Sequence, residues 1–336
     1  MNILFLSTRQ SKPSFRFRVE PMLPFFAARG HRCDVAFLAD GAWKRLRLYR
    51  RLSRYEAVFV QKRLFSRWEL SLIRRAARRL IYDLDDAVMF HADGGRDRRR
   101  QRRFHAMAAA ADLVICGNQY LADLARRAGG RTVTIPTCID TERFCSLQSP
   151  RAAARGVTIG WTGSRSTNRY LNELFPVLAA FGRRVELVVM SDAETQLDWP
   201  ALGDVPWRFV RWSPEVETTV TASFDLGLMP LPDDPWTRGK CGFKALQYMA
   251  LGRVAVAAAV GVNREIITHG EDGFLCETPG EWRAVIERLL ADAELRRRIG
   301  LAARNRIETA YSLKMHGPRT VEAVEAASRV SASRTG

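Results

Sequence analysis

Short apolar runs alternate with segments of helical periodicity along the whole chain, and this alternation limits the fold more than any other feature. Apolar runs of this length, bounded by turn residues, are typical of buried strands. Buried strands joined by helices call for parallel sheets covered by helices on both faces. The predicted strands form two series, at 3–7, 34–39, 57–61, 80–84, 113–117 and 132–136, and at 157–161, 185–190, 207–211, 225–229, 254–259 and 273–276.

Helices are predicted between these strands. In the segment at 16–29, Pro21 and Pro24 require a late start or a kink. The helical segment at 293–325 is expected to break at Tyr311 and Ser312. The remaining predicted helices are 43–53, 67–78, 97–110, 118–128, 168–182, 215–222, 240–251, 263–268 and 280–291.

The two series of strands predict two domains, and 336 residues are enough for both. A polar, proline-containing stretch separates the series. We therefore expect an N-terminal domain at 1–148, a linker at 149–156, a C-terminal domain at 157–310, and a final helix at 311–325 that crosses back to the N-terminal domain. Ligands bind beyond the carboxyl ends of strands in doubly wound sheets, so two facing domains would form one cleft.

Several classes of protein are disfavoured. No apolar run approaches the ~20 residues of a membrane helix, and the first apolar residues suit a strand rather than a signal peptide. The six cysteines show no CxxC spacing, and the five histidines are scattered. We expect reduced thiols in the cytoplasm and no structural zinc.

Positive charge is concentrated in the N-terminal third. Residues 1–110 carry +15 of the net +17, which suggests an anionic partner: nucleic acid, an acidic membrane face or a phosphorylated substrate. The run at 96–103, RDRRRQRR, suits an anionic surface, whereas the arginines at 74–79 are more simply a solvated helix face. Only Phe104 lies near the first run, so nucleic acid is the less favoured partner.

The segment at 236–275 has the pattern of a nucleotide site. Arg238 precedes a helix predicted at 240–251, whose first turn would hold Gly239, Lys240, Gly242 and Lys244. Free N–H groups and the helix dipole favour an anion there, and lysines four apart share a helix face. The chain has few lysines against many arginines, and ammonium groups suit a diphosphate. The alternative is an ordinary helix with solvated lysines.

A second phosphate contact is predicted where the strand at 157–161 meets a helix. Backbone N–H groups of Gly163 and Ser164 would face a diphosphate, and Arg165 would add a guanidinium fork. The alternative is a tight turn without a ligand.

These segments resemble the retaining glycosyltransferases of family 4, which have the GT-B fold of two Rossmann-like domains. The resemblance covers nearly the whole chain. It implies a nucleotide-diphosphate sugar donor in the C-terminal domain, an acceptor in the N-terminal domain, retention of configuration, and no metal or other cofactor. It rests on IYDLDDAV (81–88), ADLVICGNQYLADLA (111–125), TIPTCIDTERF (134–144), IGWTGS (159–164), FDLGLMPL (224–231), GKCGFKALQYMALG (239–252), GVNREII (261–267) and HGEDGFL (269–275).

The chain departs from the family at two glutamates, eight positions apart, that hold the donor. Gly239 and Gln247 stand in their places. Gln247 still offers a hydrogen-bond donor and a hydrogen-bond acceptor to ribose hydroxyls. Glu265 resembles the family's loop glutamate, or it caps a helix start.

Acceptor residues are expected in the N-terminal domain. Asp83, Asp85 and Asp86 end a predicted strand, and Asp85 or Asp86 would orient a hydroxyl or act as a base. A metal site and helix capping are the alternatives for the three carboxylates. The resemblance implies an acceptor-side role for His91, although a loop histidine is often only solvated.

The first loop replaces the family's glycine pair with cations that suit a phosphate-bearing, lipid-linked or otherwise anionic acceptor. Phe15 and Phe17 would touch an acyl chain or simply pack the helix. Asn118 is expected to contact a substrate, and Asp140 to be the N-cap of the segment TERF at 141–144. The cations are Arg9, Lys12, Arg16 and Arg18.

The sequence therefore predicts a cytoplasmic glycosyltransferase, peripheral on the inner membrane face and acting in envelope polysaccharide synthesis on a glycan or lipid-linked acceptor. The alternatives are a sugar-nucleotide epimerase or hydrolase of the same fold, and a basic nucleic-acid-binding protein.

Overall fold

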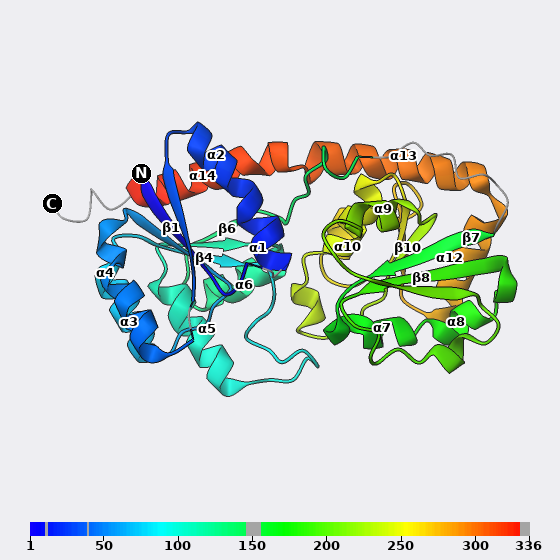
Figure 1. Ribbon diagram of the computed structural model, residues 1–336, viewed down its shortest axis with the longest axis horizontal. Coiled ribbons are helices and arrows are strands. Elements are labelled where there is room, and N and C mark those ends of the chain that lie inside the picture. The colour runs from blue at the N-terminus through cyan, green and yellow to red at the C-terminus, as the bar shows by residue number, and fades with distance from the viewer. Residues whose placement is uncertain (11–12, 39, 146–155, 330–336) are drawn as a thin grey trace. The chain divides into compact units, whose positions relative to one another are not determined.

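The computed structural model describes residues 1–10, 13–38, 40–145 and 156–329 (Figure 1). Lys12 and the predicted linker, apart from Gly156, lie outside these residues. The chain divides into two compact units. Unit 1 comprises Met1–Cys138, Asp234–Cys241 and Leu313–Gly336, and unit 2 comprises Ile139–Asp233 and Gly242–Ser312.

Unit 1 contains a six-stranded parallel sheet in the order β2-β1-β3-β4-β5-β6. Alternate side chains of its strands enter two separate cores, because successive residues of a strand face opposite sides. In β1, Leu4 and Leu6 face one core, and Ile3 and Phe5 the other. The strands are β1 Asn2–Ser7, β2 Arg32–Phe37, β3 Ala57–Gln61, β4 Leu80–Leu84, β5 Leu113–Cys116 and β6 Thr132–Thr134.

Helices cover both faces of this sheet (Figure 1). The first core is closed by α3 (Ala42–Arg50), η2 (Leu52–Arg54), α4 (Arg67–Ala76), α5 (Arg98–Ala110) and α6 (Gln119–Arg127). The second is closed by α1 (Pro13–Arg18), η1 (Glu20–Met22), α2 (Leu23–Ala28) and α14 (Leu313–Arg329). The predicted helix at 16–29 is broken as its prolines require, since Pro21 lies in η1 and Pro24 in the first turn of α2.

Unit 2 contains the second six-stranded parallel sheet, in the order β12-β11-β10-β7-β8-β9. All twelve predicted strands are confirmed within a residue or two. The strands are β7 Val157–Thr162, β8 Val185–Ser191, β9 Trp207–Arg211, β10 Leu226–Met229, β11 Val254–Ala258 and β12 Phe274–Cys276. The predicted architecture of two doubly wound parallel sheets is therefore confirmed.

Two predicted helices of this region were wrong in extent. The segment at 168–182 is split because Pro176 starts a new helix in its middle, and the helix predicted at 240–251 begins three residues late. The predicted break at Tyr311 and Ser312 is confirmed. The helices are η3 Arg165–Thr167, α7 Asn168–Asn172, α8 Phe175–Ala179, η4 Gly182–Arg184, η5 Trp199–Leu202, η6 Thr237–Gly239, α9 Glu217–Ala222, α10 Phe243–Ala250, α11 Asn263–Ile266, α12 Pro279–Ala291 and α13 Ala293–Ala310. Of these, η6 belongs to unit 1.

None of the described helices has the length and apolar content required to span a bilayer.

Each sheet contains a point at which the strand order reverses. It lies between β1 and β3 in unit 1 and between β7 and β10 in unit 2. Such switch points leave a crevice beyond the carboxyl ends of the strands, where ligands of doubly wound sheets bind. In unit 2, the hydroxyl of Tyr248 bridges the two strands, accepting from Thr162 N at 3.0 Å and donating to Leu228 O at 3.2 Å.

The ring of Tyr248 packs directly on Gly227 of β10, where an added Cβ would lie 2.3 Å from the ring. We expect Gly227→Ala to lower the free energy of unfolding by about 1–3 kcal/mol, because the ring must move within a filled core. Urea denaturation measures the change. Gly280→Ala is the matched control, since its Cβ meets nothing closer than 3.9 Å in helix α12. Equal destabilisation by both changes would contradict the packing role.

Candidate functional site

Arg18 and Asp83 form a buried ion pair at the carboxyl edge of the unit 1 sheet. The guanidinium donates to both carboxylate oxygens at 2.8–3.0 Å, and a further N–H reaches Ile135 O at 3.1 Å. Burial raises the pKa of Asp83 to about 6 against the lowering effect of Arg18, so the pair is ionised at neutral pH. Both residues were predicted to bind the acceptor, but the structure pairs them with each other.

A second cluster of charges lies beside this pair. The ammonium of Lys62 contacts the carboxylates of both Asp85, at 3.4 Å, and Asp86. Asp86 also pairs with Lys240 at 3.1 Å, so it lies between two lysines. Burial alone would raise the pKa of Asp86, but Lys240 and Lys62 outweigh it and lower the value to about 2. Asp86 is therefore a weak base at neutral pH.

Lys62 also has a constrained backbone. It directly follows β3 with φ of +55°, in the left-handed region that non-glycine residues rarely adopt. Its N–H donates to Asp83 O at 2.8 Å, which holds it against β4. Strained residues of this kind concentrate at functional sites, and this one directs a cation at Asp85 and Asp86.

The segment Asp234–Cys241 carries Lys240 and packs closely on unit 1. Asn118 donates to Lys240 O at 3.0 Å, and the Cys241 thiol donates to Asp85 O at 2.9 Å. A Cβ on Gly239 would lie 2.4 Å from Cβ of Ala87. Glycine at 239 therefore serves close packing against the end of β4.

This placement corrects the expectation that Lys240 and Lys244 share a helix face. Lys240 is extended, with ψ of 149°, and helix α10 begins only at Phe243 after a left-handed Gly242. A Cβ on Gly242 would meet Ile266 at 2.2 Å. Gly242 and Lys244 belong to unit 2, whereas Lys240 belongs to unit 1.

Asn118 serves the fold with both ends of its amide. Its oxygen caps α6 by accepting from Leu121 N at 2.9 Å, while its nitrogen holds Lys240 O. The residue is 2% exposed. It was expected to touch a substrate, but in the structure it fixes the backbone of Lys240.

Asp85 differs from its neighbours, because its buried Oδ1 has no hydrogen-bond donor among the described residues, apart from the ion-pair contact with Lys62. The three carboxylates do not converge: Asp83 faces Arg18, and Asp86 faces two lysines. No group of three or more metal-binding side chains is found in the described parts of the chain.

Other residues predicted on the acceptor side have contacts of a different kind. His91 is exposed and contacts Asp97, the N-cap of α5, at 3.3 Å. Arg16 lies over the ring of Phe17 at 4.9 Å. Phe15 and Phe17 are buried, which favours helix packing over contact with an acyl chain.

In unit 2, two of the predicted donor residues, Gly163 and Lys244, lie against the ring of Trp161. Trp161 is 1% exposed, at the carboxyl end of β7. The ammonium of Lys244 lies 5.3 Å from its ring centroid, and a Cβ on Gly163 would overlap the ring at 2.1 Å. Glycine at 163 is thus required by the indole beneath it, whatever ligand lies above.

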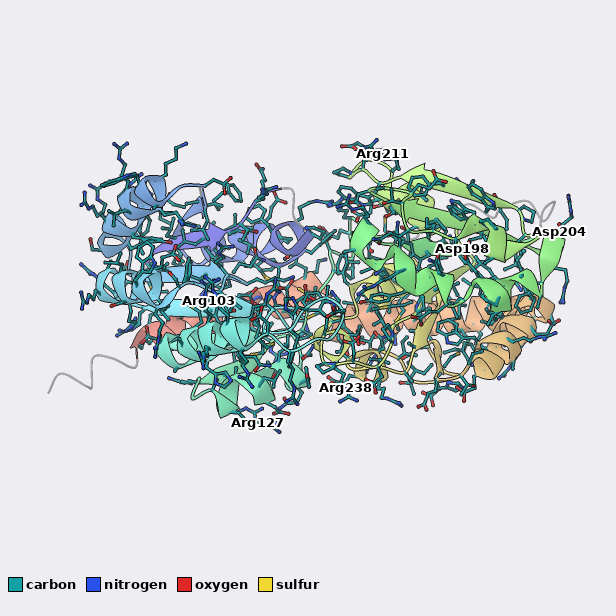
Figure 2. All side chains as sticks on the ribbon, turned by 90° about the horizontal axis from the view of Figure 1, so that it is seen from below. Arg103, Arg127, Asp198, Asp204, Arg211 and Arg238 are labelled. Carbon is teal, nitrogen blue, oxygen red and sulfur yellow. The ribbon has the colours of Figure 1, made fainter. Side chains whose placement is uncertain are left out.

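The backbone N–H groups after β7 are not available as predicted. Gly163 N donates to Met190 O at 2.9 Å, Ser164 N to Thr167 Oγ1 at 3.2 Å, and Arg165 N to Asp192 Oδ1 at 2.6 Å. The guanidinium of Arg165 is exposed. A phosphate bound after β7 would therefore be contacted by side chains and not by these N–H groups. Arg238, in unit 1, also projects outward (Figure 2).

Gln247 belongs to a buried hydrogen-bonded cluster around Glu217. Its amide donates to Glu217 at 3.1 Å, as does the indole of Trp212 at 3.2 Å, and Arg143 pairs with the same carboxylate at 3.3 Å. A carboxylate therefore lies beside the position where the resemblance expects one, but it comes from α9 instead of α10.

Two further polar residues were predicted near helix starts. Glu265 is in the first turn of α11, partial burial raises its pKa, and no described residue bonds its carboxylate. Asp140 accepts from Glu142 N and Arg143 N at 3.0 and 3.2 Å. It caps the segment TERF at 141–144, as predicted, and this segment forms a turn.

Sequence reasoning missed Lys62, Glu217 and the hydroxyl role of Tyr248. Lys62 carried a usable signal, because it follows a predicted strand and is one of few lysines. Glu217 and Tyr248 gave no signal in the sequence, because their partners Gln247 and Thr162 lie 30 and 86 residues away along the chain.

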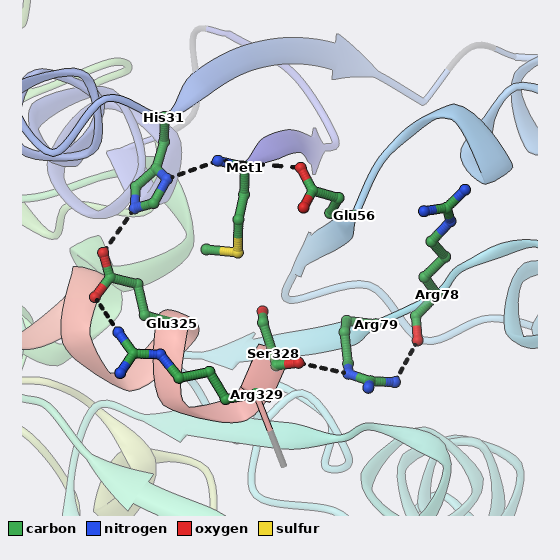
Figure 3. A pocket seen from close by; sticks show the side chains of 8 residues that line it. All are labelled: Met1, His31, Glu56, Arg78, Arg79, Glu325, Ser328 and Arg329. Carbon is green, nitrogen blue, oxygen red and sulfur yellow. Dashed lines mark hydrogen bonds and ion pairs between the residues drawn. The ribbon is translucent and has the colours of Figure 1, made fainter. Parts of the chain in front are cut away.

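A surface cavity of about 470 Å³ lies at the opposite edge of the unit 1 sheet, beside the residues that precede β2, β3 and β4 (Figure 3). Glu325 lines this cavity and forms ion pairs with His31 at 2.8 Å and with Arg29 at 2.9 Å. Ligands of such sheets bind at the carboxyl edge, so this cavity is separate from the site.

Comparison with known proteins agrees with this fold. A family model described as "Glycosyl transferases group 1" matches residues 156–292. A search of curated proteins found no significant match.

Solved GT-B structures align over almost the whole chain at low identity. HepE from Anabaena, in complex with UDP and glucose, has 18% identity and a TM-score of 0.77, covering 97% of this chain and 100% of that one. Sucrose-phosphate synthase from Thermosynechococcus elongatus has 16% identity and a TM-score of 0.79, covering 97% and 98%. A glycosyltransferase from Rickettsia africae has 11% identity and a TM-score of 0.78, covering 98% and 99%.

The bridge of Asp86 between two lysines can be tested by titration. We expect an Asp86 pKa of about 2 in NMR spectra and a higher value in Lys240→Met. Because the folded-state pKa lies below the unfolded one, the carboxylate stabilises the fold above about pH 4, by about 2 kcal/mol. This contribution is lost as the pH falls toward 2.

Lys44→Met is the matched control, because Lys44 is an exposed lysine on α3 that makes no described ion pair. It should leave the pKa of Asp86 unchanged. An ordinary pKa for Asp86 in the unmodified protein would contradict the bridge.

Proposed function

We propose that this protein is a glycosyltransferase that moves a sugar from a nucleotide-diphosphate sugar to an acceptor hydroxyl, with retention of configuration and without a metal. The match of residues 156–292 to the group 1 glycosyltransferases carries the proposal. The complexes of HepE with UDP and with UDP-glucose support a nucleotide sugar as the donor.

The donor is assigned to the switch point of unit 2, between β7 and β10. Lys244, over Trp161, and the exposed guanidinium of Arg165 supply positive charge beside the carboxyl end of β7. Fixed cations stabilise the charge that develops on a leaving diphosphate. Gln247, which donates a hydrogen bond to Glu217, is assigned to the ribose of the donor. Helix α10 has Gln247 where the family has a glutamate, and Glu217 of α9 supplies a carboxylate beside it.

The acceptor is assigned to the carboxyl edge of unit 1. In the transfer, a bond forms between the acceptor oxygen and the anomeric carbon, and the bond from that carbon to the diphosphate breaks. The nucleoside diphosphate leaves with the electron pair, and the acceptor hydroxyl gives up its proton. Asp85 is assigned to orient that hydroxyl, because its Oδ1 has only the ion-pair contact with Lys62 and no hydrogen-bond donor among the described residues.

The role of Asp86 is assigned differently. With a pKa of about 2 it is poorly suited to take a proton, but it holds Lys62 and Lys240 in place. These two ammonium groups suit an anionic acceptor, such as a lipid-linked or phosphorylated glycan. We place the enzyme in the cytoplasm, consistent with six free cysteines.

The donor assignment predicts that Lys244→Ala weakens binding of the correct nucleotide sugar by about 10- to 100-fold, the size of a lost charge-assisted contact. A thermal-shift panel of UDP-, GDP-, ADP- and dTDP-sugars first identifies the donor. Lys44→Ala is the matched control and should bind as the unmodified protein does. Unchanged donor affinity in Lys244→Ala would refute the assignment.

The acceptor assignment predicts that Asp85→Asn keeps donor affinity while reducing transfer at least about 100-fold, the lower range for a group acting in proton transfer. Products are measured by mass spectrometry with a panel of phosphorylated and lipid-linked glycans. Free sugar or an epimer formed at full rate without acceptor would instead favour a hydrolase or an epimerase.

A further inference from the structure

Three neighbouring helices of unit 1 carry a strongly basic surface, and none of them holds a residue assigned to a substrate. Helices α3, α4 and α5 close the same core of the sheet and contact one another in that order (Figure 1). Arg45 of α3 pairs with Glu69 of α4 at 3.3 Å, and Arg74 of α4 pairs with Asp112, just after α5, at 3.0 Å. We call this surface the α3–α5 face.

The α3–α5 face is almost free of negative charge. The three helices carry twelve lysines and arginines and one carboxylate, Glu69, which is 7% exposed. Among the described residues, carboxylates pair with only three of the twelve cations: Arg45, Arg74 and Arg100. The other nine have no described ion pair, so the face carries a large uncompensated field. Figure 2 shows Arg103, which α5 contributes to it.

Two tryptophans stand exposed within this positive field. Trp43, in the first turn of α3, is 79% exposed, and Trp68, in the first turn of α4, is 52% exposed. Each lies within two residues of the Arg45–Glu69 ion pair that joins the two helices. Exposed indoles among arginines are typical of surfaces that enter the headgroup region of a bilayer.

A groove of about 320 Å³ runs between α4 and α5 on the same face. Its arginines stand around an apolar floor, an arrangement that suits a lipid phosphate and the first carbons of its chains. The arginines are Arg67 and Arg75, which have no described ion pair, and Arg74, which is paired with Asp112; the floor is Leu70, Ala106 and Ala110.

We propose that the α3–α5 face docks on an anionic lipid surface, with Trp43 and Trp68 in the headgroup region and the arginines on lipid phosphates. Nucleic acid fits this face less well. The arginine-rich start of α5 has no exposed aromatic for a base to stack on, since Phe104 is 1% exposed, and the two exposed indoles stand instead in the first turns of α3 and α4. The proposal goes beyond the transfer reaction and does not depend on it, because lipid binding is measured without donor or acceptor.

Binding is measured by co-sedimentation of the full chain with vesicles of phosphatidylglycerol and phosphatidylcholine, and with phosphatidylcholine alone. We expect binding to the anionic vesicles only, weakened by salt. Each juxtamembrane cation contributes about fivefold to partitioning. The triple variant Arg47→Glu, Arg75→Glu, Arg102→Glu, with one change in each helix, should therefore lose at least about 100-fold.

Matched changes in unit 2 serve as controls. Arg183→Glu, Arg283→Glu and Arg298→Glu together alter the net charge equally at exposed positions, and this variant should bind clearly better than the α3–α5 variant. Trp43→Ser with Trp68→Ser should lose at least about tenfold, whereas Leu301→Ser, at a side chain 60% exposed, should lose little. Circular dichroism checks that each variant is folded.

Equal losses in the two charge variants would overturn the proposal, since binding would then follow net charge alone. Binding to phosphatidylcholine as tight as to anionic vesicles would also overturn it. So would single-stranded DNA that binds more tightly than the vesicles and is released by the same α3–α5 variant, because the face would then be a nucleic-acid surface.

Discussion

Parallel strand pairing is the constraint on which the rest of this structure depends. Every strand must be followed by a crossover that returns to the same end of the sheet, so the carboxyl ends and the loops after them collect at one edge. In unit 1 this edge gathers Asp83, Asp85, Asp86 and Lys62 from two neighbouring strands. Charges concentrated in this way must be paired when they are buried.

The pairing explains which charged residues remain available for chemistry. Arg18 and Asp83 neutralise each other, and Asp86 is held by two lysines. Asp85 keeps one ion-pair contact, with Lys62 at 3.4 Å, but no described residue donates a hydrogen bond to its Oδ1. The candidate site of unit 1 is thus the remainder of a charge network and not a collection of independent groups.

The glycines near the two sites illustrate how packing and ligand binding compete as explanations. Gly163 and Gly239 both stand at places where a phosphate-binding loop is expected. In the structure, Gly163 lies against the ring of Trp161, and Gly239 lies against Ala87. A side chain at either position would collide with the protein itself, so these glycines need no ligand to explain them. The assignment of the donor therefore depends on side chains such as Lys244.

The sequence by itself determined the fold, because the periods of strands and helices are local properties of the chain. It located all twelve strands and the proline breaks in the first helix. It also located the ends of β4 and β7, which carry Asp83 and Trp161. Only the tertiary structure decided the partners of charged groups. Lys240 pairs with Asp86, 154 residues away, and Gln247 with Glu217, 30 residues away. Such contacts depend on strand order and on close packing between elements, neither of which leaves a periodic trace in the sequence.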